Sequence, residues 1–285
     1  MPLKRSLTTA SESANRDGPI QVAIDQFPGR PVFDTAVTHA LLRRVSEGAI
    51  PETIRLYVPD DIVLFSLLDA RRPGFALARD KAQQCGFDSV LRLAGGHAAL
   101  FHPRCLAFSW AMPDFGEPDG IRKRFEKVAG WIQKGLVRMG VDARIGEVSG
   151  EYCPGEFSIN CAGRVKLMGI GQRVIRGAAH VGGVIVVGDS PRVRDVLEPI
   201  YEALELDWNP ATAGSIEEAV PGAQPDEVRS RLLQVLETER AWTSAVIDAD
   251  TLSRAEALSE WHDPHGSPRA TALASVGSKS LTLQD

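Results

Sequence analysis

The chain has 285 residues, of which 44% are hydrophobic and 24% charged, and its formal net charge at pH 7 is −5. This composition is typical of an ordinary soluble globular protein and argues against a general polyanion binder, so we expect no nucleic-acid partner. A chain of this length buries about three-quarters of its unfolded surface, which allows one large core or two smaller ones.

The two ends of the chain differ from its middle. Residues 1–18 are rich in Ser, Thr, Ala and charge without an apolar run, so we expect a disordered N-terminus rather than a signal peptide. Residues 263–285 have a similar composition and are predicted to be a flexible tail. Because no stretch reaches the roughly 20 apolar residues that cross a bilayer, we expect no membrane partner.

The cysteine spacing favours a reducing compartment. The four cysteines, at positions 85, 105, 153 and 161, have no short paired spacing of the CxxC type. They resemble neither a disulfide framework nor a zinc site. We therefore predict no metal and a cytoplasmic location.

Hydrophobic periodicity predicts the elements of the first half of the chain. A helix begins at Asp34, a candidate cap, and has apolar residues at intervals of three and four up to residue 47. Short β-branched and aromatic runs indicate strands, and Gly86 ends a second helix. After the helix over 34–47, the predicted order is strand 54–58, strand 62–65, helix 74–85, strand 90–93 and, after Gly95-Gly96, an apolar run over 98–110.

The second half begins and ends with helices. Apolar and charged residues alternate on a helical period over 119–139, and Pro191 at a first helical position begins another helix at Ser190. The predicted elements after helix 119–139 are strands 141–148, 157–161, 165–170 and 179–187, then helices 190–206 and 226–242.

Strands outnumber crossover helices, and several connections are too short for parallel links. The sequence therefore predicts an α+β protein with a mixed, largely antiparallel sheet flanked by helices. A doubly wound nucleotide fold is excluded, because regular βα alternation and an early GxGxxG are both missing. We expect a catalytic domain over 19–208 and a helical extension over 209–262 that packs on it.

Cys153 and Lys166 are the leading candidates for chemistry. Lys166 is the only lysine between Lys134 and Lys279, in a stretch that otherwise uses arginine. An ammonium on a flexible stem can shift its pKa and polarise a carbonyl, which arginine does poorly. If 156–161 and 164–170 form a hairpin, Lys166 lies beside the Cys153 loop and lowers the thiol pKa. A cysteine that merely fills a corner is the competing interpretation.

Two further clusters combine a basic residue, small residues, a histidine and a glycine pair. The first contains Arg92, Gly95, Gly96 and His97. A glycine pair between strands can be only a tight turn, or it can let the linear chain of a ligand lie against bare backbone. The second cluster runs from Arg176 through His180 to Gly182 and Gly183.

Together these motifs resemble the biotin/lipoate protein ligase and octanoyltransferase superfamily. The resemblance covers about residues 31–240 and is carried by Arg92-x-x-Gly95-Gly96, Ala98-x-x-x-His102, Lys166-x-x-Gly169-x-x-Gln172-Arg173 and Arg176-Gly177 to His180-x-Gly182. It implies a biotin/lipoate protein ligase-like catalytic domain in which Lys166 binds the acyl carbonyl and the Gly-Gly loop lines an acyl tunnel. Tyr152-Cys153-Pro154-Gly155 is similar to the cysteine-dependent octanoyltransferases of the amidotransferase type. His97 departs from the family pattern, and its role is open.

The resemblance implies a protein-lysine acyltransferase of lipoate metabolism. An octanoyl or lipoyl group would pass through a Cys153 thioester, with Lys166 stabilising the oxyanion and no cofactor. The expected donor is acyl carrier protein or octanoylated glycine cleavage H protein, and the acceptor is a lipoyl domain of a 2-oxoacid dehydrogenase complex. Substrate binding is assigned to Arg92, Gly95, Gly96, His97, Gly169, Gln172, His180, Gly182 and Gly183.

Two alternatives stay open from the sequence. The first is a lipoate-protein or biotin-protein ligase, which would form an acyl-adenylate with ATP and Mg and in which Cys153 would be incidental. The second is a catalytically inactive homologue that binds carrier domains.

Overall fold

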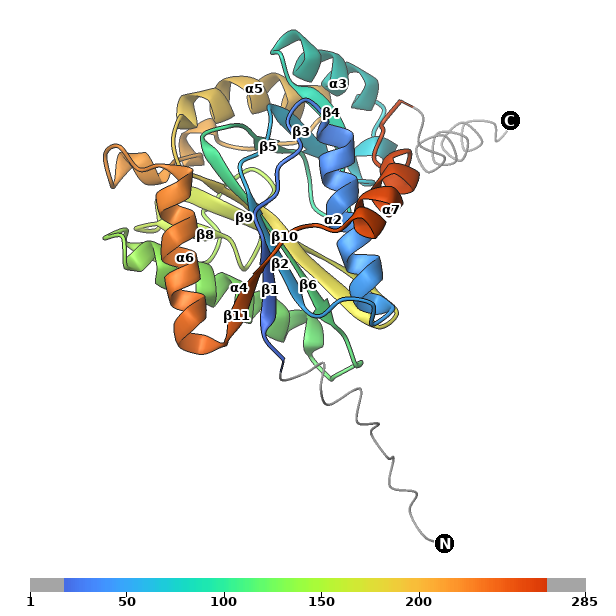
Figure 1. Ribbon diagram of the computed structural model, residues 1–285. Coiled ribbons are helices and arrows are strands. Elements are labelled where there is room, and N and C mark those ends of the chain that lie inside the picture. The colour runs from blue at the N-terminus through green and yellow to red at the C-terminus, as the bar shows by residue number, and fades with distance from the viewer. Residues whose placement is uncertain (1–17, 266–285) are drawn as a thin grey trace, which may run out of the picture.

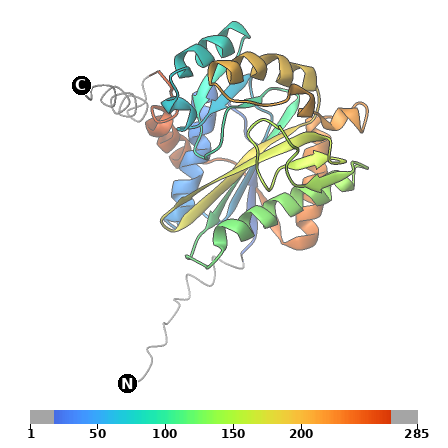
Figure 2. The same cartoon turned by 180° about the vertical axis from the view of Figure 1, so that it is seen from behind.

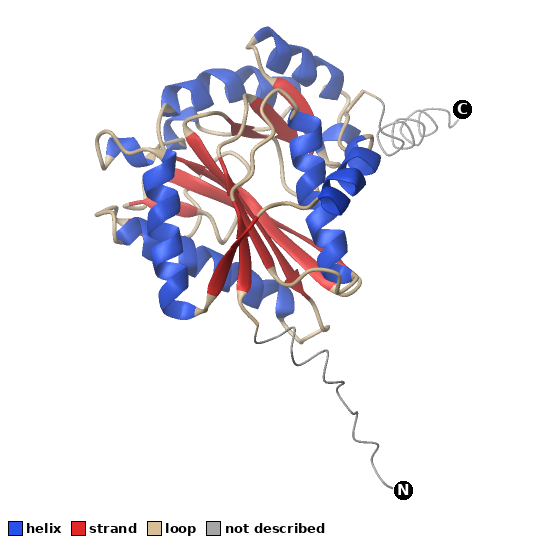
Figure 3. Ribbon diagram, viewed as in Figure 1, coloured by secondary structure: helices blue, strands red, loops and turns tan. Residues whose placement is uncertain are grey.

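The computed structural model describes residues 18–265, and most of the predicted disordered N-terminus and of the predicted flexible tail lies outside the described residues. Strands and helices alternate irregularly along the chain (Figures 1 and 3). In chain order the elements are β1 (Ile20–Ala23), α2 (Pro31–Ser46), β2 (Thr53–Tyr57), β3 (Ile62–Phe65), the 3-10 helix η1 (Asp69–Arg71), α3 (Phe75–Gln84), β4 (Asp88–Leu91), β5 (Ala99–Phe101), β6 (Cys105–Pro113), α4 (Gly120–Val137), β7 (Ala143–Ile145), β8 (Ile159–Cys161), β9 (Val165–Ile175), β10 (Ala178–Val186), α5 (Ser190–Ala203), the 3-10 helices η2 (Pro210–Thr212) and η3 (Ile216–Glu218), α6 (Pro225–Glu239), β11 (Trp242–Ala245) and α7 (Ala249–Ser259).

A large sheet forms the centre of the molecule. Its eight strands follow the order β11-β1-β2-β6-β10-β9-β8-β7. The pairs β11–β1 and β1–β2 are parallel, and all the others are antiparallel. The long hairpin of β9 and β10, drawn in yellow, crosses the molecule in the view from behind (Figure 2). The predicted α+β class with a mixed, largely antiparallel sheet is confirmed.

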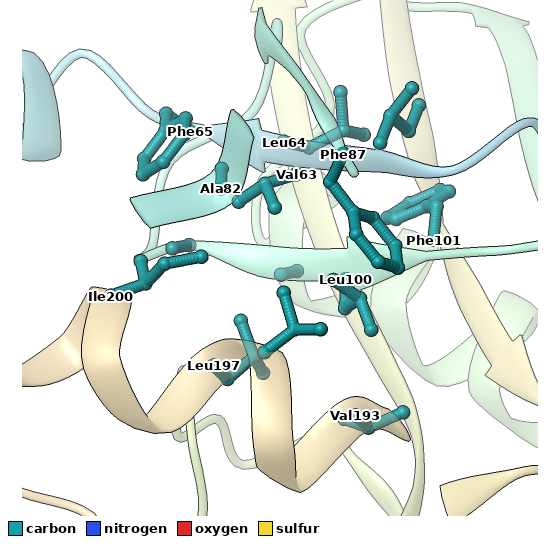
Figure 4. Packing of buried hydrophobic residues seen from close by; sticks show 14 of the residues in the cluster. Val63, Leu64, Phe65, Ala82, Phe87, Leu100, Phe101, Val193, Leu197 and Ile200 are labelled. Atoms are coloured by element: carbon teal, nitrogen blue, oxygen red, sulfur yellow. The ribbon is translucent and has the colours of Figure 1, made fainter. Parts of the chain in front are cut away.

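A second, smaller sheet has the order β4-β3-β5 and carries its own core. Helices α3 and α5 pack on this sheet and on each other. Figure 4 shows Leu197 and Ile200 of α5 on the side of the helix that faces β5, with Leu100 of β5 directed towards the helix. This subdomain supplies the loop between β4 and β5, which contains the Gly95-Gly96 pair.

Helices cover the two faces of the large sheet (Figure 1). On one face α4 and α6 pack together, with Trp131 and Leu232 in a core that also contains Phe108 and Met168. On the other face α2 packs on β6 and β10, and α7 packs on α2. The apolar face of each helix is therefore buried against the sheet or against a neighbouring helix.

The segment 209–262, expected as a helical extension, is joined to the body in three ways. Helix α6 packs on α4, α7 packs on α2, and β11 adds an unpredicted strand to the edge of the large sheet. In the described part of the chain, no helix combines the length and apolar character that crossing a bilayer requires.

Several predicted boundaries are wrong. The first helix begins at Pro31 rather than Asp34, and Asp34 lies inside the first turn, buried and hydrogen-bonded to the guanidinium of Arg55. Strands 141–148 and 157–161 shrink to Ala143–Ile145 and Ile159–Cys161, because most of the intervening residues form the loop that presents Cys153. Helix 226–242 ends at Glu239, where the chain turns into β11.

Glycine at position 183 allows β9 and β10 to approach closely. A Cβ added there would lie 1.9 Å from the carbonyl oxygen of Gly169, whereas a Cβ at Gly130 of α4 would meet nothing within 4 Å. We predict that Gly183→Ala lowers the free energy of unfolding by about 2 kcal/mol or more, because the backbone must shift. The matched control Gly130→Ala should leave it unchanged or raise it by up to about 1 kcal/mol. Denaturant unfolding of both variants checks this, and equal values for the two would contradict it.

Candidate functional site

Cys153 lies at a fixed bend in the loop between β7 and β8. Its φ is +42°, in the left-handed region that non-glycine residues rarely adopt. The Cys153 amide donates to the hydroxyl of Tyr201 on α5 at 2.9 Å, and this hydroxyl donates to the carbonyl of Ala98 at 2.9 Å. The loop is therefore tied to α5 and, through Tyr201, to the residue that precedes β5.

Lys166 of β9 holds the same loop from the other side. Its ammonium donates to Oε1 of Glu151 at 2.9 Å, to the carbonyl of Tyr152 at 2.9 Å and to the carbonyl of Cys153 at 2.8 Å. The side chains of Lys166 and Glu151 are both 0% exposed. An ammonium has three protons to donate, so all of them are used in fixing the loop.

Glu151 is held in turn by its neighbours. Its carboxylate accepts a hydrogen bond from Ser158 Oγ at 2.6 Å and from the amide of Val148 at 2.8 Å. A buried ion pair is tolerated when its remaining hydrogen-bonding capacity is satisfied in this way. The loop from Val148 to Ser158 is thus organised around one buried charge pair.

A β-bulge directs Lys166 towards this loop. In the pairing of β8 with β9, Ile159 lies opposite Met168 but Asn160 lies opposite Lys166, so Leu167 is an extra residue on β9. An inserted residue reverses the alternation of side chains across the two faces of a strand. The bulge therefore brings Lys166 to the same face as Gly169, where a Cβ would lie 3.3 Å from Lys166 Cε. The predicted hairpin is confirmed, and it includes a bulge that the sequence did not reveal.

The Gly-Gly loop between β4 and β5 approaches the sulfur. The main-chain amide of His97 donates to Cys153 Sγ at 3.2 Å, and Nη2 of Arg92 lies 3.5 Å from the same atom. The same Nη2 also donates to the carbonyl of His97 at 2.6 Å. Gly96 has φ +93°, and a Cβ there would lie 2.7 Å from both Sγ and Nη2. Residue 96 must therefore be glycine, both because its φ is positive and because a side chain would clash with the sulfur and with Arg92. Gly95 is exposed, and a Cβ added there would meet nothing within 4 Å.

These contacts set the ionisation of the thiol. Burial raises the pKa of Cys153, but the charges of Arg92 and Lys166 and the hydrogen bonds from Arg92 and the His97 amide outweigh it, so that the net pKa is lowered. Cys105, which is buried without cations, has its pKa raised to about 12. The site therefore favours the nucleophilic thiolate at Cys153.

The imidazole of His97 is paired with a buried carboxylate. Nδ1 lies 2.9 Å from Oδ1 of Asp69, the first residue of η1, and the Asp69 side chain is 0% exposed. The other carboxylate oxygen of Asp69 accepts from the amide of Ser66 at 2.8 Å. The ring of His97 is thus fixed by Asp69, while the main-chain amide of the same residue contacts the nucleophile.

A narrow cavity lies behind Arg92. It is lined by Thr35, Thr38, Tyr57, Leu64, Arg92, Leu93, Ala94, Phe101, Phe108, Ser109, His180, Gly182 and Gly183. Nδ1 of His180 lies 3.2 Å from the Ser109 hydroxyl, and burial lowers the pKa of His180 to about 4, so the ring is neutral. A Cβ at Gly182 would lie 2.5 Å from Cε1 of that ring. The wall is largely apolar, with a few fixed polar groups.

Most of the predicted site residues come together, and one does not. Gln172 accepts from Nε of Arg124 at 2.5 Å and donates to the carbonyl of Ile121 at 3.1 Å, so its side chain lies against α4. Position 172 is on the face of β9 opposite Gly169 and Gly171. The structure therefore separates Gln172 from Cys153.

Three residues of the site were not expected: Asp69, Glu151 and Tyr201. The sequence did contain a signal for Glu151, because an acidic residue near the cysteine can form an ion pair with a buried lysine. Asp69 and Tyr201 had none, since each comes from an element distant in sequence from the residue that it contacts. In the described residues no group of three His, Cys, Asp or Glu side chains could hold a metal ion.

Residues 30–237 match the family model of the lipoyl protein ligase A/B catalytic domain. An octanoyl-[GcvH]:protein N-octanoyltransferase of Geobacillus kaustophilus is 28% identical over 63% of this chain and 65% of its own length. The enzyme of the same name from Oceanobacillus iheyensis is 28% identical over 78% of this chain and 82% of its own. The chain thus spans slightly less than two thirds of the first relative. A lipoyl-[GcvH]:protein N-lipoyltransferase of Listeria monocytogenes is 26% identical over 62% of this chain and 66% of its own length.

Solved structures have the same fold. A crystal structure of lipoate-protein ligase A bound with ATP superposes with a TM-score of 0.71 at 20% identity, over 85% of this chain and 95% of that one. A putative lipoate protein ligase from T. acidophilum with bound lipoic acid superposes with a TM-score of 0.67 at 20% identity, over 85% of this chain and 94% of that one. At this identity the likeness concerns the fold alone.

The lowered thiol pKa is testable at Arg92. We predict that Arg92→Gln raises the pKa of Cys153, because it removes the guanidinium that contacts the sulfur. The pH dependence of iodoacetamide alkylation, mapped to Cys153 by mass spectrometry, should shift to higher pH. Arg254→Gln, on exposed α7, should leave the profile unchanged. An unshifted profile in Arg92→Gln would contradict the electrostatic account.

The buried pair is testable by a double-mutant cycle. Lys166→Met is expected to lower the free energy of unfolding by about 3–5 kcal/mol, because it leaves the Glu151 carboxylate buried and unpaired. Glu151→Gln combined with Lys166→Met should recover much of this loss. Lys134→Met, which breaks an exposed pair with Glu239, should cost less than about 1 kcal/mol. Equal losses in denaturant unfolding for the two lysine variants would rule out a structural role for the pair.

Proposed function

Because the chain belongs to the lipoyl protein ligase A/B catalytic domain family, we propose that it is a protein-lysine acyltransferase that carries an octanoyl or lipoyl group on Cys153. The observation that supports this most is the environment of the thiol. Arg92 and the main-chain amide of His97 contact its sulfur, Lys166 binds the Cys153 carbonyl, and together these groups lower the pKa of the thiol despite burial. A thiolate so held is suited to nucleophilic catalysis.

The reaction proceeds by two transfers. The Cys153 thiolate attacks the carbonyl of the acyl donor, and the first carrier leaves as the Cys153 thioester forms. The lysine amine of a second carrier then attacks the thioester and releases the thiolate. No nucleotide enters either transfer, so the proposed reaction needs neither ATP nor Mg.

We assign the carriers from the names of the relatives. Those proteins are named for an acyl group on GcvH and its transfer to a protein. For this chain we propose octanoylated glycine cleavage H protein as the donor, with acyl carrier protein as the thioester alternative. The acceptor is a lipoyl domain of a 2-oxoacid dehydrogenase complex.

The oxyanion of each transfer needs donors that are already oriented. The amide of His97 and the guanidinium of Arg92 point at the sulfur, within reach of an attached carbonyl. Lys166, the predicted oxyanion stabiliser, lies behind the carbonyl of Cys153 and has all three protons engaged. It acts on the oxyanion only by exchanging one of these bonds, and otherwise through its charge.

The narrow cavity is the proposed site of the acyl chain. Leu64, Phe101 and Phe108 supply apolar walls, while Gly182 and Gly183 leave bare backbone for a linear chain. Arg92 both lines this cavity and contacts Cys153 Sγ. A chain lying in the cavity therefore has its carbonyl end directed to the nucleophile.

The Cys153 thioester is directly testable. Wild-type protein incubated without ATP with octanoylated glycine cleavage H protein, or with octanoyl-acyl carrier protein as the thioester donor, should gain the mass of one octanoyl group, labile to hydroxylamine and mapped to Cys153. Cys153→Ala should gain no such mass and should lose transfer to a lipoyl domain by about 1,000-fold or more, as expected on removing a covalent nucleophile. Cys161→Ala, at a second partly buried cysteine, is the matched control and should react like wild type.

The same experiment separates the alternatives. Lipoylation that strictly requires ATP and leaves no adduct would identify a ligase. A protein that binds carrier domains but transfers nothing under either condition would be an inactive homologue.

A further inference from the structure

We propose that the imidazole of His97, held by Asp69, moves the protons of the transfer reaction and thereby lets the protein accept an amide as acyl donor. This inference rests on the proposed function, and it assigns a role to the one site residue that the resemblance left open. It concerns the side chain of His97, whereas the contact with the sulfur is made by its main-chain amide.

An amide donor requires a proton that a thioester donor does not. When the Cys153 thiolate attacks octanoyl-lysine, a C–S bond forms and the C–N bond must break. The nitrogen leaves as a neutral amine only if it receives a proton, here from the imidazolium, which becomes imidazole. With a thioester donor the leaving group is a thiolate, which departs without one.

The second transfer runs the same exchange in reverse. A neutral lysine amine of the acceptor, having released one proton to solvent, attacks the Cys153 thioester. The C–N bond forms, the C–S bond breaks, and the attacking nitrogen passes its extra proton to the imidazole. The products are the acylated acceptor, the Cys153 thiolate and an imidazolium that is ready for the next donor.

The other groups around Cys153 are poorly suited to this exchange. Arginine stays protonated throughout the accessible pH range, so Arg92 does not donate its proton. Lys166 has its three protons engaged by Glu151 and two main-chain carbonyls. The hydroxyl of Tyr201 donates to a carbonyl, and burial raises its pKa well above the ordinary value. Imidazole is the side-chain group that serves most often as general acid and base, and among the described groups next to Cys153 it is supplied by His97.

The geometry orients this imidazole for the task. Asp69 is fully buried and fixed by the amide of Ser66, so its carboxylate accepts from Nδ1 and leaves Nε2 as the exchanging nitrogen. Nε2 lies on the far side of the ring from Asp69, and the side chain of His97 is 26% exposed. Because the main-chain amide of the same residue lies 3.2 Å from Cys153 Sγ, the ring is within a side chain's length of the nucleophile, where the proposal places the carrier lysine.

The test compares leaving groups. Single-turnover formation of acyl-Cys153 is measured by mass spectrometry with octanoyl-acyl carrier protein, a thioester, and with octanoylated glycine cleavage H protein, an amide. His97→Gln is expected to slow the amide reaction about 100-fold or more, the range of general acid catalysis, and the thioester reaction less than about 10-fold. Asp69→Asn keeps the imidazole. It should also slow the amide reaction more than the thioester reaction, but by a smaller factor than His97→Gln.

Two controls separate proton transfer from damage to the site. His265→Gln, at an exposed histidine that contacts Arg79, should leave both rates unchanged. Iodoacetamide alkylation of Cys153 should proceed in His97→Gln and Asp69→Asn at close to the wild-type rate, because both variants keep Arg92, Lys166 and the main-chain amide of residue 97, which lower the pKa of the thiol. Asp69→Asn decides the question if His97→Gln fails to fold.

The outcomes distinguish the inference from the function beneath it. Equal losses with both donors in His97→Gln, or no loss with either, would overturn the role of the imidazole while leaving the Cys153 thioester intact. A wild-type protein that reacts with the thioester donor and not with the amide would also overturn the role of the imidazole, while the Cys153 thioester would stand. Failure of the wild-type protein to form an adduct with either donor would overturn both proposals.

Discussion

The buried bond between Lys166 and Glu151 is the constraint on which the site depends. It crosses from β9 to a loop with no regular structure of its own, and both partners are removed from water. Such a pair contributes little to net stability, because desolvation of the two charges offsets their attraction. Its effect is on conformation: the ammonium also binds the carbonyls of Tyr152 and Cys153 and holds the latter at a positive φ. The cysteine is therefore presented at the cost of local strain, as is common at reactive positions.

The same cations have an electrostatic consequence. A sulfur as buried as that of Cys153 would ordinarily be a neutral thiol, as Cys105 is. Arg92 approaches the sulfur directly and Lys166 acts from behind the main chain, so the two charges reverse the effect of burial. The arrangement needs glycine at position 96, because any side chain there would separate Arg92 from the sulfur. The absence of a side chain at Gly96 thus controls the chemistry of Cys153, which is distant in the sequence.

The sequence predicted the parts of the site that depend on local pattern. The β8–β9 hairpin, the position of Lys166 beside Cys153 and the Gly-Gly turn after β4 follow from strand periodicity and turn residues. The parallel strands β1 and β11 were missed, because each is short and pairs with a partner far along the chain. Asp69 was missed for the same reason, since only the tertiary fold brings η1 beside the β4–β5 loop. Gln172 matched a motif, yet the alternation of β9 turns its side chain to Arg124. Motif spacing alone could not reveal this, because the bulge at Leu167 changes which residues share a face.

The bulge also explains how one strand serves two surfaces. Beyond Leu167 the even positions of β9 face α4, where Met168 and Ile170 pack in the core and Gln172 is hydrogen-bonded to the helix. The odd positions 169 and 171 face the reaction site and are glycines, and a Cβ at Gly171 would lie 2.8 Å from Cβ of Ala94 in the loop between β4 and β5. Without the extra residue, Lys166 would fall among the even positions and its ammonium would enter the apolar core under α4. Burying the ammonium there without a charged partner would cost a large amount of folding free energy. The irregularity in β9 is therefore the local feature that allows a single strand to pack a helix on one face and fix a nucleophile on the other.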